Sequence, residues 1–199
     1  WDAVVFFDFV CLPQVPRSAE EEHAFRQCLP HMGMLYSMFP TMILHEVLPE
    51  THGYMESGWC YCEYQTAKLG GQLKEYSHDV DKALGVIEEG RASFSDGQKL
   101  EQFMATLESK VQEKRFHFPS DAENVRRIIS AFALKRMLMN AIEIGDMEQL
   151  RSAVARMRDQ QLARSTLDQP VNAALETPLH VAVRKANFAG AKVLIDSGA

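Results

Sequence analysis

The sequence lacks an excess of basic residues and any long apolar run. Lysine and arginine total 21 against 27 aspartates and glutamates, which gives a net charge of −6. A nucleic-acid-binding protein neutralises phosphates with a basic surface, so this balance argues against nucleic acid as a partner. No uninterrupted apolar stretch reaches the roughly 20 residues that a membrane-spanning helix needs. We therefore expect neither a nucleic-acid partner nor a membrane segment.

Cysteine is also scarce, with four residues in a chain of 199. That number is too small for a disulfide scaffold and favours a reduced, cytoplasmic protein. Cys60 and Cys62 lie near His52, but a helix would place the two thiols on different faces, so no metal site is expected. Cys11 and Cys28 are interpreted as small core residues.

The usual nucleotide-binding motifs and catalytic triads are missing. No G-x-G-x-x-G follows an apolar strand, and no G-x-x-x-x-G-K-S/T occurs anywhere in the chain. We therefore expect no bound cofactor. The composition is otherwise that of an ordinary globular protein, with 46% hydrophobic and 24% charged residues.

The first third of the chain shows alternating strand and helix signals. Residues 3–10 (AVVFFDFV) and 41–49 (TMILHEVLP) are apolar and rich in β-branched or aromatic types, which predicts strands covered on both faces. A helix is predicted over about 19–29 and another between Ser57 and Gly70. This order predicts an α/β domain with a small parallel sheet and a right-handed crossover.

Local signals mark where these helices begin and end. Ser18 and Glu21 form the pattern of a capping box, in which each side chain bonds a backbone N–H of the first turn. Pro30 is expected to interrupt the helix before a second helical stretch. Ser57 is a suitable N-cap, and Gly70 with the glycine after it is expected to stop the following helix.

The middle of the chain is predicted to be helical. Residues 81–89 and 98–111 have apolar side chains at helical spacing. Ser120 and Glu123 repeat the capping-box pattern and are expected to open a long amphipathic helix that runs through Leu134.

The C-terminal segment carries the most specific motif. Residues 177–182 (TPLHVA) are followed by helix-forming sequence up to Ala199. This motif resembles the ankyrin repeat, whose signature is T-P-L-H-x-A. Thr177 and the proline after it set a tight turn, His180 is expected to cap the helix through its side chain, and Ala182 lets neighbouring helices approach. The resemblance implies an all-α ankyrin solenoid that binds a protein partner.

A weaker copy of this pattern precedes the clear repeat by 41 positions (141 to 182). The paired residues are Ala141 with Ala182, Gly145-Asp146 with Ala186-Asn187, Met147 with Phe188, and Val154 with Ile195. We interpret 136–170 as a degenerate first repeat and 171–199 as a clear one. Because about three repeats are needed for stability, we expect the array to continue beyond Ala199.

Two clusters of polar and aromatic residues follow the predicted strands. One covers residues 7–14 (FDFVCLPQ) and the other covers 54–63 (YMESGWCYCE). Ligands of open parallel sheets bind at the carboxyl ends of the strands. We therefore expect both clusters to face one crevice.

The second cluster, Y-x-x-S-x-W-C-x-x-E, is similar to a segment of TIR domains, and the first resembles the W-I-D-x-x-C-I-N-Q pattern of heterokaryon-incompatibility domains. The resemblance covers about residues 4–68 and implies a flavodoxin-like domain that self-associates. It also implies, in some members, cleavage of NAD, which would make Glu63 the essential acid and Asp8, Gln14 and Trp59 ligand-binding residues. A fixed carboxylate can stabilise the cationic sugar that forms when an N-glycosidic bond breaks.

Structural interpretations of the same residues remain open. Glu63 also suits an exposed first-turn acid favoured by the helix dipole, and Trp59 suits a core anchor. Asp8 lies within an apolar strand, where an unpaired carboxylate is costly, so it is paired or faces the crevice.

These observations predict a TIR-like α/β domain over 1–115 that lacks its first strand, a helical connector over 116–135, and ankyrin repeats over 136–199. The predicted function is a signalling adaptor that binds a protein through the repeats and self-associates through the α/β domain. The alternative is an NAD glycohydrolase with Glu63 as the acid, and whether the chain is an enzyme stays open.

Overall fold

The computed structural model describes residues 6, 11–43, 52–75 and 97–199. The chain divides into two compact units, Trp1–Met32 and Gly33–Ala199. The predicted strand at 3–10 and the predicted helix at 81–89 fall outside the described residues, apart from Phe6, which is not in a strand. No described helix is long and apolar enough to cross a membrane.

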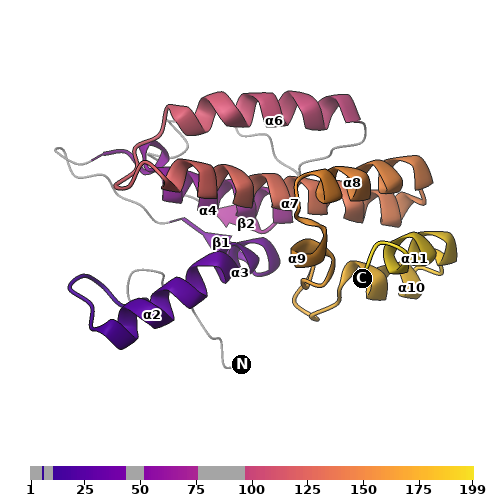
Figure 1. Cartoon of the computed structure of the whole chain (residues 1–199), viewed down its shortest axis with the longest axis horizontal. Coiled ribbons are helices and arrows are strands. Elements are labelled where there is room, and N and C mark those ends of the chain that lie inside the picture. The colour runs from indigo at the N-terminus through magenta and orange to yellow at the C-terminus, as the bar shows by residue number, and fades with distance from the viewer. Residues whose placement is uncertain (1–5, 7–10, 44–51, 76–96) are drawn as a thin grey trace. The chain divides into compact units, whose positions relative to one another are not determined.

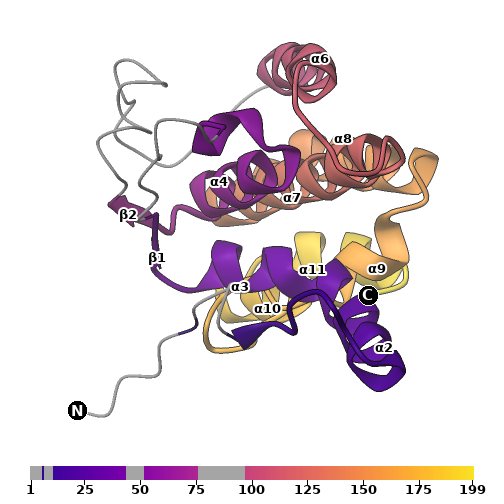
Figure 2. The same ribbon diagram turned by 90° about the vertical axis from the view of Figure 1, so that its left-hand side faces the viewer.

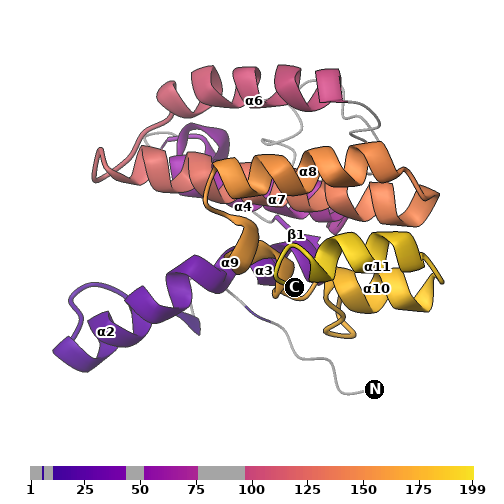
Figure 3. The ribbon, with the colours of Figure 1, turned by 45° about the vertical axis from the view of Figure 1, so that its right-hand side comes forward.

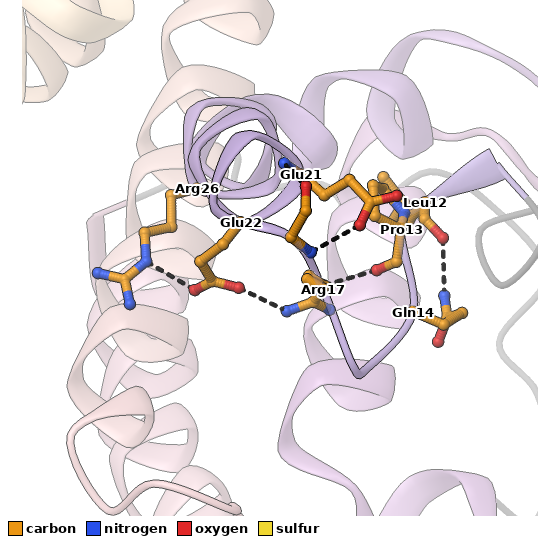
Figure 4. Close-up of polar contacts among 8 residues, drawn as sticks. Leu12, Pro13, Gln14, Arg17, Glu21, Glu22 and Arg26 are labelled. Atoms are coloured by element: carbon orange, nitrogen blue, oxygen red, sulfur yellow. Dashed lines mark hydrogen bonds and ion pairs between the residues drawn. The ribbon is translucent and has the colours of Figure 1, made fainter.

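The first unit is built on helix α2 (Ala19–Cys28), whose predicted capping box is present. The Ser18 backbone N–H donates to Glu21 Oε2 at 2.8 Å, and the Glu21 N–H donates to Ser18 Oγ at 3.2 Å. Each bond satisfies a backbone donor that the first turn of a helix leaves without an intrahelical acceptor. The predicted start of this helix is therefore confirmed (Figure 4).

Arg17 ties the chain before α2 to the helix itself. Its Nε donates to the carbonyl of Pro13 at 2.6 Å, and its Nη1 donates to Glu22 at 3.1 Å (Figure 4). The guanidinium also lies 3.7 Å from the ring centre of Phe25, a cation–π distance. Arg26 binds the second oxygen of Glu22 at 2.7 Å.

Helix α2 buries none of its residues. The interpretation of Cys11 and Cys28 as core residues is therefore wrong, since both are exposed. Cysteine packs as a small apolar residue only where enough apolar surface surrounds it, and this helix carries three glutamates in its first turn.

Pro30 interrupts the helix as predicted. A 3₁₀ turn, η1 (Leu29–His31), contains the proline, and α3 (Met32–Met38) follows it. Proline has no N–H to donate and its ring clashes with the preceding turn, so a regular α-helix does not run through it.

The predicted α/β fold with a parallel sheet is wrong. The described residues are mostly helical, and their extended structure is the short pair β1 (Thr41–Met42) and β2 (Leu73–Glu75), which run parallel (Figure 2). Among the described residues no further strand pairs with these two, so they form a two-stranded sheet and not the core of an α/β domain. The described segment between the two strands is a helix, and it packs mainly against another helix rather than against a sheet.

That segment is α4 (Gly58–Gly70), preceded by the 3₁₀ turn η2 (Tyr54–Glu56). The predicted cap is confirmed, because Ser57 Oγ accepts the N–H of Cys60, and Gly71 ends the helix in the left-handed region at φ 67°. Gly70 lies so close to α3 that an added Cβ would sit 2.2 Å from the carbonyl oxygen of Ser37. A side chain at position 70 would therefore push the two helices apart.

Two long helices follow, α6 (Gly97–Gln112) and α7 (Asp121–Ile144). Both helices were predicted, but the prediction of a capping box at Ser120 is wrong. Ser120 has helical backbone angles and makes no side-chain cap, while the Glu123 carboxylate accepts from Arg126 Nε at 2.8 Å. The arginine one turn later engages the side chain that the capping box requires.

Helix α7 is the centre of the second unit. It contacts α4, α6 and two C-terminal helices, α8 (Met147–Asp159) and α10 (Pro178–Arg184) (Figure 1). Its fully buried apolar side chains include Val125, Ile129, Ala133, Met137 and Leu138. Since these residues continue one hydrophobic cluster that runs from Tyr61 to Leu194, the unit has one main core.

The C-terminal helices form two pairs. Helix α8 packs on α7, the short α9 (Ala163–Leu167) follows it, and α10 packs against α11 (Phe188–Ile195) (Figure 3). The predicted opening of α10 is confirmed: Thr177 is the N-cap, proline occupies the first turn, and His180 Nδ1 accepts the Thr177 N–H at 3.2 Å. Ala182 is fully buried, which fits the expectation that it lets neighbouring helices approach.

The domain boundaries predicted at 115, 135 and 170 do not coincide with the division between the two units. Helix α7 runs without a break from the predicted connector into the predicted first repeat. Residues on both sides of position 115 share the hydrophobic cluster around α7. Position 115 thus lies inside one unit.

Candidate functional site

A hydrogen bond joins Tyr54, in the turn η2, to Glu63, in the middle of α4. The Tyr54 hydroxyl donates to Glu63 Oε2 at 2.9 Å, and both side chains are half-buried. Burial and the adjacent Glu63 charge raise the pKa of Tyr54 well above its usual value. The phenol therefore stays protonated near neutral pH and remains a donor to the carboxylate.

Trp59, one turn before Glu63, anchors α4 to α7. Its indole Nε1 donates to Asp121 Oδ2 at 3.1 Å, and its ring packs against the main hydrophobic cluster. Asp121 lies in the first turn of α7, where a carboxylate also interacts favourably with the helix dipole. Of the two interpretations of Trp59, this geometry favours the core anchor.

The segment between α6 and α7 covers the beginning of α4. The Gly58 N–H donates to the carbonyl of Arg115 at 3.0 Å, and the Arg115 N–H donates to the carbonyl of Glu56 at 2.8 Å. The ring of Phe116 lies so close that a Cβ on Gly58 would be 1.9 Å from it. Glycine at position 58 is thus required for this close approach.

Burial changes the pKa of two further side chains on α4. Burial raises the pKa of Tyr61 to about 12, although a hydrogen bond from Gln65 acts in the opposite direction. Burial also raises the pKa of the Cys62 thiol, which keeps it protonated and unreactive at neutral pH. The described residues hold no cluster of three or more side chains suited to a metal ion.

The four predicted site residues have different outcomes. Trp59 and Glu63 lie one turn apart on α4. Gln14 belongs to the first unit, where its side chain donates to the carbonyl of Leu12 at 3.0 Å (Figure 4), and Asp8 falls outside the described residues. The shared crevice, and with it the NAD glycohydrolase hypothesis, stays a prediction that nicotinamide release by the full chain would test.

A second polar cluster was missed by the sequence reasoning. Lys135 of α7 is buried, and its Nζ donates to the carbonyl of Pro170 and lies 5.4 Å from the ring centre of Phe132. Burial lowers the pKa of Lys135 to about 8. The burial of Lys135 could have been suspected from the sequence, because this lysine lies one turn after Ala131 and one turn before Met139 on the apolar side of a predicted helix.

No protein-family model matches the chain, and the searches of curated proteins and of solved structures found no match.

The Tyr54–Glu63 pair predicts coupled effects of substitution. We expect Tyr54→Phe and Glu63→Met to show a coupling free energy of about 1–2 kcal/mol in a double-mutant cycle, because methionine removes the carboxylate acceptor and a hydrogen bond to a charged group is stronger than a neutral one. The free energy of unfolding would be measured in urea for both single variants and the double variant. Tyr54→Phe combined with Glu123→Gln, an exposed residue of α7, is the control and should be additive. Additive effects in the Tyr54–Glu63 cycle would show that the pair is not formed in solution.

Because Lys135 is buried, we predict that the free energy of unfolding rises with pH. Its pKa is about 8 in the folded chain, against 10.5 for an unperturbed lysine, so between these pH values the unfolded chain binds more protons and the free energy of unfolding increases with pH. Below pH 8 the full cost of the buried charge is present, on the order of 3 kcal/mol. Relative to Lys135→Met, the wild type should therefore gain stability from pH 8 to 10.5. A difference that is constant over this interval would contradict the lowered pKa.

Proposed function

We propose that the chain is an intracellular interaction module that binds a protein partner through its C-terminal helical pair, residues 171–199. The resemblance of residues 177–182 to the ankyrin repeat motivated this function. The observation that carries it is a preorganised, partly apolar surface formed by the turn before α10 and by the exposed sides of α10 and α11.

The turns that open α8 and α11 support the idea of two related repeats. The Asp146 N–H donates to the carbonyl of Ala141 at 3.0 Å, and the Asn187 N–H donates to that of Ala182 at 2.9 Å. Asp146 and Asn187 each cap the next helix by accepting a backbone N–H at 2.9 Å. The residue before each cap, Gly145 or its counterpart at 186, has a positive φ. This agreement supports the alignment of the two copies at this turn.

The two copies diverge further along. Val154 is buried at 3% exposure, whereas Ile195, its predicted counterpart, is 57% exposed. Helix α8 has 13 residues and α11 has 8. Val154 and Ile195 occupy the same position of their helices but differ in burial, so burial lends no support to the alignment of this pair.

The turn before α10 is held rigidly. The Val171 N–H donates to the carbonyl of Glu176 at 2.7 Å, and Asn172 Oδ1 accepts two backbone N–H groups of the turn at 3.1 and 3.2 Å. Arg184 of α10 binds the Glu176 carboxylate through two nitrogens, at 2.7 and 3.0 Å. These bonds fix the tip of the turn, so little conformational entropy is lost when a partner binds it.

Apolar side chains are exposed on this turn and on the two helices that follow it. Leu175, at the tip, is 64% exposed, and Val183 and Phe188 on the two helices are 54% and 72% exposed. Exposed apolar groups on rigid backbone are typical of protein-binding surfaces. A protein partner with a complementary apolar surface would bury them.

The proposal does not extend to the N-terminal part of the chain. Self-association of that part is implied by the resemblance of residues 4–68 to TIR-type domains, and the α/β fold implied with it is contradicted by the structure. Self-association stays a prediction without structural support among the described residues.

The surface predicts selective loss of binding. We expect Leu175→Asp and Phe188→Asp to weaken binding at least about tenfold, because a carboxylate would replace a buried apolar contact. A partner would be identified by proximity labelling with the full chain, purified, and titrated against each variant. Val15→Asp is the matched control, since Val15 is 80% exposed and lies in the first unit. Equal affinities for all variants, or equal loss in the control, would contradict the proposal.

A further inference from the structure

A small cavity lies beside Lys135 in the second unit. Its volume is about 50 Å³, and it is open to solvent on one side. The residues that line it come from α3, α4, α7 and the segment before α10, namely Ser37, Leu69, Gly70, Phe132, Lys135, Arg136, Met139 and Val171. One water needs roughly 10–15 Å³ of such space, so the cavity accommodates a molecule of a few non-hydrogen atoms.

The charge around this cavity is of one sign. Lys135 and Arg136 both line it, and no aspartate or glutamate does. Lys135 is 6% exposed, and among the described residues it forms no ion pair. An ammonium group has three N–H donors, and the carbonyl of Pro170 accepts one of them. A buried, incompletely bonded cation beside an empty space favours an anion.

The apolar part of the cavity lining determines which class of anion fits best. Leu69, Phe132, Met139 and Val171 present apolar side chains to the same space. A fully polar oxyanion such as phosphate would lose hydration against these walls without compensation. A short aliphatic carboxylate satisfies both halves of the lining, since its oxygens accept from the cations and its alkyl part contacts the apolar side chains.

We propose that this cavity is a binding site for a short aliphatic carboxylate, with Lys135 as the principal charged contact. The inference is independent of the protein-binding surface on the C-terminal helices. Because Val171 lines the cavity and also begins the rigid turn before α10, a bound carboxylate would stabilise the position of that turn.

The test measures thermal stability of the full chain with sodium propionate at constant ionic strength. We expect the Tm of the wild type to rise with the logarithm of the propionate concentration above the Kd, by about 3 °C at ten times the Kd, and propionamide, which has the same shape without charge, to have no effect. Lys135→Met should lose the response. Lys185→Met, which removes an exposed lysine, should keep it.

Sodium phosphate and two tripeptides, one with a free and one with an amidated C-terminus, complete the series. If the tripeptide with a free C-terminus raises the Tm more than propionate does, the site still binds a carboxylate, and its ligand is the C-terminal carboxylate of a peptide. A response to phosphate that equals or exceeds the response to propionate would overturn the choice of a carboxylate. So would equal responses of wild type and Lys135→Met, equal effects of propionate and propionamide, or no response at all.

A second measurement does not depend on how well the variant folds. In wild-type chain with labelled methionine methyl groups, propionate should shift the NMR signal of Met139, which lines the cavity, and leave that of Met157, a core residue of α8, in place. Shifts of both signals, or of neither, would overturn the proposal.

Discussion

The burial of helix α7 is the constraint on which the second unit depends. A helix with large apolar side chains on several sides is stable in water only when other elements cover each of those sides. Helices α4, α6, α8 and α10 do so, and they come from segments on both sides of α7 in the chain. The positions of Trp59, of Lys135 and of the C-terminal pair all follow from their contacts with this one helix or its neighbours.

The packing around α7 determines the environment of two polar side chains. Trp59 reaches across 62 positions of sequence to bind Asp121, so the start of α4 and the start of α7 are fixed together. Lys135 is held in the core although its charge is poorly solvated there. A buried charge that has no carboxylate partner lowers stability. Position 135 differs from the other buried positions of α7 because it carries such a charge next to a cavity.

Local signals in the sequence predicted local structure well. The caps at Ser18, Ser57 and Thr177 and the break at Pro30 are confirmed because each depends on residues within one turn. The box at Ser120 failed for an equally local reason, the competing arginine at 126. The α/β fold is wrong because the described residues outside the short β1–β2 pair are mainly helical and pack on one another. Which elements cover a given helix is decided by long-range packing, which local apolar patterns do not report. The candidate site shows the same limit: the sequence identified Glu63 and Trp59, but their bonds to Tyr54 and Asp121, and the burial of Lys135, are properties of the assembled helices.

The central claim is that residues on both sides of position 115 fold as one cooperative unit around α7. The direct test is urea unfolding of a Trp1→Phe chain, in which Trp59 fluorescence reports on α4 and the Met157 methyl NMR signal reports on α8. A single unit predicts the same midpoint for both probes. Separate midpoints, with α4 and α8 unfolding independently, would contradict the account and restore a domain boundary between them.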